Sequence, residues 1–328
     1  MASWQELYDG GSAQAEQKIF AGLAQDMLAI QERNRRKAGK DRPDRTLHAK
    51  MLVGVTDAQL IVDPALPEIF CMGHFRPGAT LATAVRFSNA SAIPQPDSAP
   101  DMRGAALKIQ LDGHDVHDLL MTSYPVSHAR NARQFVEFAV IAQGPRETFV
   151  ERLVAQFGEG EAKRMIDNVQ HAAQPCASLA TQRFWSRGAI LWGETPVRFD
   201  LRPLAGTEPS AAVSEDPDFL EAEFASRVAS KDVSFRLALQ PFASEEETPI
   251  EDASVPWKED ISAPVEVATL IISQRLLNSD DGKRQADEVA SMAFNPWNAP
   301  ASFRPLGNLN RVRGVVYGMS AARWQRGQ

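Results

Sequence analysis

Four short apolar runs between residues 46 and 125 decide the fold. They read LHAKMLVGV (47–55), LATAVRFSN (81–89), RGAALKIQL (103–111) and HDLLM (117–121). Each run is β-prone or mixed in composition, and clusters of proline, glycine or aspartate separate it from the next, which is typical of successive strands. The sequence therefore predicts a strand-rich region that begins near residue 46.

Helical patterns precede, interrupt and follow this region. Apolar residues at three- and four-residue spacing predict an opening helix over 12–36 and a closing helix over 308–324. Between them the sequence predicts helices over 132–142, 147–156, 160–172 and 280–293, and further strands at 189–193, 197–201, 233–242 and 265–273. Regular strand–helix alternation is missing, so these patterns predict an α+β fold with a largely antiparallel sheet or barrel.

Composition and charge indicate which binding partners and which cellular compartment to expect. The chain has 328 residues, 42 acidic against 35 basic, and a formal net charge of −7, which weighs against nucleic acid and anionic membranes as partners. No window approaches the roughly 20 apolar residues needed to cross a bilayer, so we expect no membrane insertion. Two distant cysteines, Cys71 and Cys176, are too few for a disulfide framework or a four-cysteine metal site. These features, and the lack of a visible targeting segment, predict a cytoplasmic protein.

One pair of side chains near the C-terminus indicates a chemical role. Arg313 and Tyr317 lie four residues apart in a predicted helix and so share one face. Tyrosine is scarce, with only Tyr8 and Tyr124 elsewhere, and Tyr317 alone has an arginine one helical turn before it. A nearby cation favours the phenolate form of a tyrosine.

Basic, aromatic and small residues also recur in an informative order. The segments are Arg45-Thr46-Leu47-His48-Ala49-Lys50, Arg86-Phe87-Ser88, Asp101-Met102-Arg103-Gly104-Ala105-Ala106-Leu107-Lys108, Asp118-Leu119-Leu120-Met121-Thr122-Ser123-Tyr124-Pro125, Arg130 with Phe135, and Arg313-Gly314-Val315-Val316-Tyr317. In that order they closely resemble the heme catalase superfamily, and in particular its small branch of catalase-related peroxidases. The resemblance runs from about residue 45 to 138 and resumes from 294 to the last helix.

The resemblance implies roles on both sides of a heme. Tyr317 would be the proximal iron ligand, with Arg313 as its partner. On the distal side, His48 would move the peroxide proton, Ser88 would support His48, and Thr122 would stand where large catalases carry an asparagine that hydrogen-bonds peroxide. A neutral imidazole can take a proton from a bound peroxide and return it to the departing oxygen.

The same resemblance implies a binding shell for heme b. Arg45 and Arg86 would pair with the heme propionates, because bidentate donors suit carboxylates. Arg323 is a third candidate for this pairing, although its spacing after Tyr317 departs from the large catalases. Phe135 would lie against the heme face, and Asp101 would line the access channel.

Several departures from the large catalases bear on function. Thr122 has a shorter reach than asparagine, which argues against efficient disproportionation of hydrogen peroxide. Ser127 and His128 replace a pair of phenylalanines and should make that part of the pocket more polar. The chain is also far shorter than a full catalase, so an NADPH site cannot be assigned.

The sequence thus predicts one catalase-like domain over 1–328, with an N-terminal helix within 1–40, a barrel with inserted helices over 45–275 and a C-terminal helical segment over 280–328. An eight-stranded antiparallel β-barrel would hold heme b between the strand face of His48 and the helix of Tyr317. The favoured function is a peroxidase with weak or moderate catalase activity, acting on hydrogen peroxide or organic hydroperoxides with an organic reductant. Rearrangement of fatty acid hydroperoxides, as in allene oxide synthase, and a non-catalytic heme sensor or carrier remain alternatives. A homodimer is left open.

Overall fold

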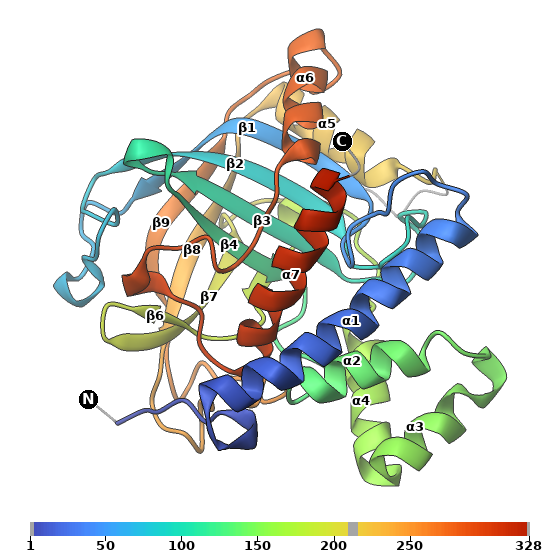
Figure 1. Cartoon of the computed structure of the whole chain (residues 1–328). Coiled ribbons are helices and arrows are strands. Elements are labelled where there is room, and N and C mark those ends of the chain that lie inside the picture. Colours follow the sequence, from blue (N-terminus) through green and yellow to red (C-terminus); the bar gives the residue numbers. More distant parts are fainter. Residues whose placement is uncertain (1–2, 209–215, 327–328) are drawn as a thin grey trace.

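The computed structural model describes residues 3–208 and 216–326. Within them one nine-stranded sheet dominates (Figure 1). Its strands are β1 (Met51–Val62), β2 (Thr80–Asn89), β3 (Arg103–Gln110), β4 (Val116–Thr122), β5 (Phe184–Ser186), β6 (Ile190–Trp192), β7 (Thr195–Pro203), β8 (Val233–Pro241) and β9 (Val265–Ile272).

The sheet closes into a barrel. Strand order is β5-β4-β3-β2-β1-β9-β8-β7, every neighbouring pair is antiparallel, and β5 also pairs with β7 to close a ring of eight strands. Strand β6 lies outside this ring as a hairpin partner of the first part of β7. The eight-stranded antiparallel barrel expected from the sequence is therefore confirmed, and closure leaves the ring without free sheet edges.

Alternation along the strands separates a barrel core from an outer face. In β2, Val85 and Phe87 belong to the large apolar core, whereas Arg86 and Ser88 point to the opposite face. Both polar side chains are nevertheless buried. The outer face of this part of the barrel is therefore covered by other elements.

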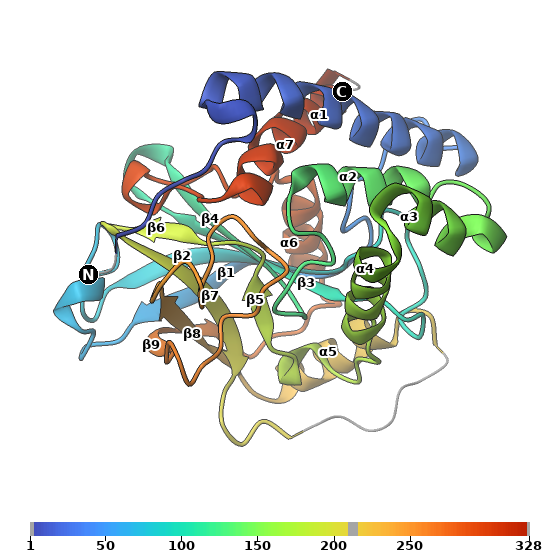
Figure 2. The same cartoon turned by 90° about the horizontal axis from the view of Figure 1, so that it is seen from below.

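Helices provide that cover. The α-helices of the described ranges are α1 (Ala13–Lys37), α2 (Ala132–Ile141), α3 (Phe149–Phe157), α4 (Glu159–Ala172), α5 (Phe219–Ser230), α6 (Asp280–Ser291) and α7 (Asn308–Arg326). Of these, α1, α2, α6 and α7 lie at this face. Helices α1, α2 and α7 share a second apolar core that includes Phe20, Val136 and Val312 (Figures 1 and 2). None of the helices in the described ranges is both long and apolar enough to span a bilayer.

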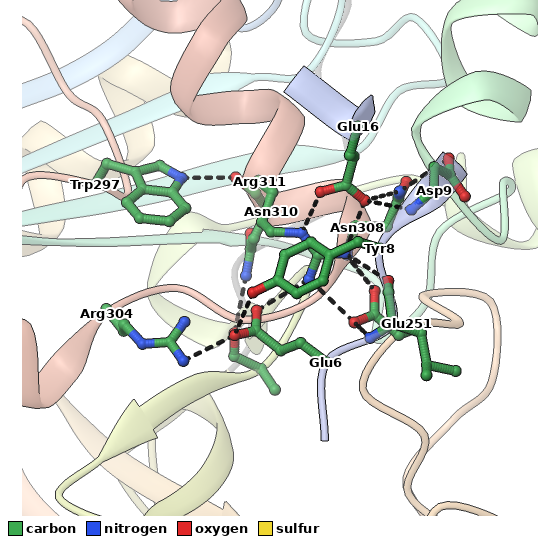
Figure 3. A network of polar contacts seen from close by, with 12 residues as sticks. Glu6, Tyr8, Asp9, Glu16, Glu251, Trp297, Arg304, Asn308, Asn310 and Arg311 are labelled. Atoms are coloured by element: carbon green, nitrogen blue, oxygen red, sulfur yellow. Dashed lines mark hydrogen bonds and ion pairs between the residues drawn. The ribbon is translucent and has the colours of Figure 1, made fainter. Parts of the chain in front are cut away.

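A buried ion network fixes the start of α7 (Figure 3). Arg311 pairs with Glu6 at 2.9 Å, with Glu16 of α1 at 2.6 Å and with Glu251 at 3.0 Å. Because these carboxylates surround it, the pKa of Arg311 is raised despite its burial, and its charge is held. Three segments distant in sequence thereby converge on one helix end.

Two elements were not predicted from the sequence. Strand β5 has only three residues, too few for a recognisable period. Helix α5 does show helical spacing, because its buried residues Leu220, Phe224 and Val228 repeat every four positions, and this signal was missed. The acidic loop before β9 buries Ile250 and Trp257 in a small apolar cluster with Ala189 and Leu306.

Candidate functional site

A cavity of about 450 Å³ lies between the outer face of β2–β4 and helix α7, with α1, α2 and the segment after α6 completing its wall. Most of the site residues predicted from the sequence line it. They are Arg45, His48, Arg86, Ser88, Thr122, Phe135, Arg313 and Tyr317. Segments from both ends of the chain therefore contribute to one chamber.

Strand register places two hydroxyls in one row on this wall. Ser88 of β2 lies opposite Gly104 of β3, and Gly104 lies opposite Thr122 of β4. Directly opposed residues in neighbouring strands face the same side of a sheet. The row therefore presents Ser88 and Thr122 to the cavity on either side of a glycine.

His48 reaches this row through an unusual backbone conformation. Its φ of 58° lies in the left-handed region, which non-glycine residues seldom adopt. The backbone N–H donates to the Ala90 carbonyl at 3.1 Å, and the His48 carbonyl accepts from Arg86 at 2.8 Å. With these bonds holding the strained residue, Nδ1 of the ring lies 3.1 Å from the Ser88 Oγ.

Gly104 makes room for that ring. A Cβ at position 104 would lie 2.5 Å from His48 Nδ1, 2.7 Å from His48 Cε1 and 2.8 Å from Ser88 Oγ. Real Cβ atoms essentially never make contacts this short. The imidazole can therefore sit this close to β3 only because position 104 has no side chain.

The electrostatics of the cavity keep His48 neutral. Burial, followed by the positive charges of Arg86 and Arg313, lowers the pKa of His48 to about 3. Arg45 and Arg187 add further cationic groups to the wall, whereas Asp44, the carboxylate of the lining, is neutralised by Lys40 at 2.6 Å. A neutral imidazole in a cationic chamber can accept a proton from a ligand at ordinary pH.

Arg86, which is buried, and Arg45, which is half-buried, supply that positive charge. Burial lowers the pKa of Arg45, and burial with the neighbouring Arg45 lowers the pKa of Arg86 to about 9. Arg45 donates to the Met292 carbonyl at 2.7 Å and to the Ala290 carbonyl at 3.1 Å. Arg86 keeps its Nε buried without a partner. An anionic group in the cavity would satisfy that donor.

Tyr317 and Arg313 occupy the α7 side of the cavity. The Arg313 guanidinium carbon lies 5.4 Å from the centre of the Tyr317 ring, and one of its nitrogens donates to Asn310 Oδ1 at 2.9 Å. The one-turn spacing predicted to bring the two side chains together does so in the structure.

No family model matches the chain. A catalase-related peroxidase from Mycolicibacterium paratuberculosis is 26% identical over 254 residues, which cover 74% of this chain and 78% of that protein. Solved catalases superpose on the fold described above. The chain has a catalase-like fold and is similar in sequence to a catalase-related peroxidase.

The structural likeness extends over most of the catalase-like chain. A fungal catalase superposes with a TM-score of 0.71 at 18% identity, over 89% of this chain and 62% of its own. Catalase A from Saccharomyces cerevisiae superposes with a TM-score of 0.64 at 16% identity, over 88% of this chain and 62% of its own. For a bacterial catalase the TM-score is 0.62 at 15% identity, over 91% of this chain and 60% of its own. The chain thus spans about three fifths of the length of these catalases.

Two predicted site residues of the catalase-like chain do not line the cavity. Arg323 is exposed and donates to the Leu28 carbonyl of α1 at 3.3 Å. Six residues along an α-helix correspond to a rotation of about 240° from Tyr317, so the side chain leaves the cavity face. Asp101 accepts from the backbone of Ala90 and Ser91 at 3.2 and 3.0 Å, and burial raises its pKa. It thus holds the turn whose Ala90 carbonyl fixes His48.

Of the two residues expected to make the pocket polar, one does so. His128 lines the cavity with a buried, unpartnered Nε2 and packs against Phe135 and Phe138. Ser127 is fully buried outside the cavity lining, and its hydroxyl oxygen accepts from the Ala129 N–H. The expectation that Ser127 makes the pocket more polar was therefore wrong.

Arg187 is the cationic residue of the cavity lining that sequence reasoning missed. It lies between β5 and β6, and its guanidinium donates to the Val126 carbonyl. Burial, then repulsion from Arg313, lowers its pKa to about 10. The signal available was slight: an arginine followed by glycine in a short turn.

Proposed function

We propose that this chain binds heme b in the cavity and consumes peroxide, as a peroxidase with weak or moderate catalase activity. The observation that carries the proposal is the convergence on one cavity of a neutral, serine-paired histidine and a tyrosine beneath an arginine. Neither pair alone distinguishes this function from ordinary packing. Together with the catalase-like fold, they match the two sides of a heme site.

The residues that line the cavity fit a heme group. The unpartnered Arg86 Nε is a buried cationic donor that a heme propionate would satisfy, and Arg45 adds a second cation nearby. Phe135 and His128 supply flat rings to the wall, and the Tyr317 phenol supplies an oxygen donor for iron. Tyr317, Arg313, Arg45, Arg86 and Phe135 are therefore proposed to hold the heme.

Each distal residue has a proposed task. Bound heme would supply the redox chemistry of O–O cleavage. His48, whose Nδ1 is paired with Ser88, has Nε2 left to take the peroxide proton and return it to the departing oxygen. Thr122 Oγ1 lies 3.4 Å from the Tyr124 carbonyl, a long contact that leaves the hydroxyl free to turn toward a peroxide.

The proposal is tested by loading the purified chain with heme and adding hydrogen peroxide. We expect dye oxidation with an organic reductant, slow oxygen release, and a fall of about 100-fold or more in His48→Ala. The matched control is His171→Ala, because His171 is exposed on α4. Unchanged turnover in His48→Ala would contradict the proposal, and consumption of a lipid hydroperoxide without reductant or oxygen release would favour rearrangement chemistry instead.

A further inference from the structure

Asn310 is a buried amide in the first turn of α7 that connects three parts of the molecule. Its side-chain nitrogen donates to the Ala189 carbonyl at 2.9 Å, and its side-chain oxygen accepts from Arg313 at 2.9 Å. Its backbone carbonyl accepts from the Trp297 indole at 2.8 Å (Figure 3). The residue is 3% exposed, so these bonds do not compete with bulk water.

The chemistry of its partners fixes how the amide is turned. A guanidinium can only donate and a backbone carbonyl can only accept. The Asn310 oxygen must therefore face Arg313, and the nitrogen must face Ala189. Flipping the amide would break both bonds at once, so the residue holds its two partners in one fixed relation.

The loop bonded to Asn310 carries a second cation that lies near Arg313. Residue 188 is a glycine whose Cβ would lie only 2.7 Å from the Asn310 nitrogen, so the loop backbone rests directly on the amide. Arg187 immediately precedes it and lines the cavity with Arg313. The lowered pKa of Arg187 includes repulsion from Arg313, consistent with two neighbouring like charges.

We propose that Asn310 is a positioning residue that holds Arg313 over Tyr317 directly and fixes Arg187 at the same wall through the backbone at Ala189. The half-buried guanidiniums of Arg187 and Arg313 repel each other, so each must be held in place. Asn310 holds Arg313 directly and supports the backbone beside Arg187, and so keeps positive charge beside the tyrosine that is proposed to hold the iron. The functional consequence rests on the proposed heme function, whereas the positioning itself concerns only residues of this chain.

The chain offers two discriminating variants besides Asn310→Ala. Asn310→Asp keeps oxygens for Arg313 and loses the donor to Ala189. Asn308→Ala removes an equally buried asparagine of the same helix turn, one that bonds Ala132, Glu16 and Asp9 and does not line the cavity. It should weaken the docking of α7 without touching Arg313, so it controls for a merely structural effect.

Crystal structures of the heme-free variants test the positioning first. In Asn310→Ala we expect the Arg313 guanidinium to leave the Tyr317 ring and the loop at 187–189 to move. In Asn310→Asp only the loop should move, and in Asn308→Ala neither should. Arg313 remaining over Tyr317 in Asn310→Ala, or moving equally in Asn308→Ala, would overturn the proposal.

Heme-loaded protein then tests whether Asn310, by placing Arg313, affects the heme site. We expect Asn310→Ala to change the ferric absorption and phenolate Raman bands and to release heme to an acceptor protein about tenfold faster, equivalent to roughly 1.4 kcal/mol. Asn308→Ala should keep the spectrum of the unmutated protein. If Asn310→Ala kept that spectrum too, the consequence would be refuted. If the unmutated chain bound no heme, the proposed function would fail, and the heme-free structures would still decide the positioning.

Discussion

Replacing Gly104 by alanine should disable His48 with little damage to the barrel. The added Cβ would lie 2.5 Å from His48 Nδ1, and ordinary contact begins at 3.4 Å, so the ring must withdraw by about 0.9 Å. The backbone of β3 cannot yield easily, because it is paired on both sides, to Ser88 and to Thr122. A displacement of about 1 Å in a catalytic group can cost 10²-fold in rate, and overpacking costs about 1–3 kcal/mol of stability.

The assay is rapid mixing of the heme-loaded variant with hydrogen peroxide, followed by urea unfolding of the same preparation. Gly54→Ala is the matched control, because its Cβ would crowd Val289 of α6 at 3.0 Å instead of His48. We expect both variants to lose stability and only Gly104→Ala to lose about two orders of magnitude in rate. A Gly104→Ala protein that reacts as fast as the control would refute the role of the close approach.

Three further predictions follow from the same geometry. Arg311→Met should lower the free energy of unfolding by about 3–5 kcal/mol, because it leaves the buried Glu16 unpaired, while Lys163→Met in an exposed pair should change little; urea titration measures both. Ser88→Ala should slow peroxide reaction about tenfold through loss of the bond to His48, with a stability change near 1 kcal/mol, and an unaltered rate would remove that support role. Because the fold lowers the pKa of His48 to about 3 from 6.5, its contribution to stability is present above pH 6.5 and is lost as pH falls toward 3. The peroxide rate should therefore be flat between pH 8 and 5, and a loss centred near pH 6.5 would contradict the neutral buried state.

Local patterns predicted most elements but not the way the barrel closes. The long strands β2 and β3 carried clear turn signals at both ends, and α1 showed regular apolar spacing with Ser12 as its N-cap. Closure depends on β5, three residues whose pairing with β7 is set by the rest of the sheet. Such a strand exists because of its neighbours and has no pattern of its own.

The candidate site was accessible to sequence reasoning only in part. The spacing of Arg313 and Tyr317 follows from helical geometry, whereas bringing them to the cavity of His48 required the family resemblance. Arg187 reaches the cavity through a loop docked on Asn310, a tertiary contact that no local pattern encodes. Arg323 shows an error in the other direction, because the family resemblance predicted it in the site. The rotation of the helix between Tyr317 and Arg323 turns its side chain away from the cavity.

The most direct test of heme ligation by Tyr317 is the ferric absorption spectrum of the heme-loaded Tyr317→Phe protein. Tyr8→Phe is the control, because Tyr8 packs against Arg311 away from the cavity. We predict that Tyr317→Phe loses the high-spin ferric spectrum of the unmutated protein and that Tyr8→Phe retains it. An identical spectrum in Tyr317→Phe would contradict the account.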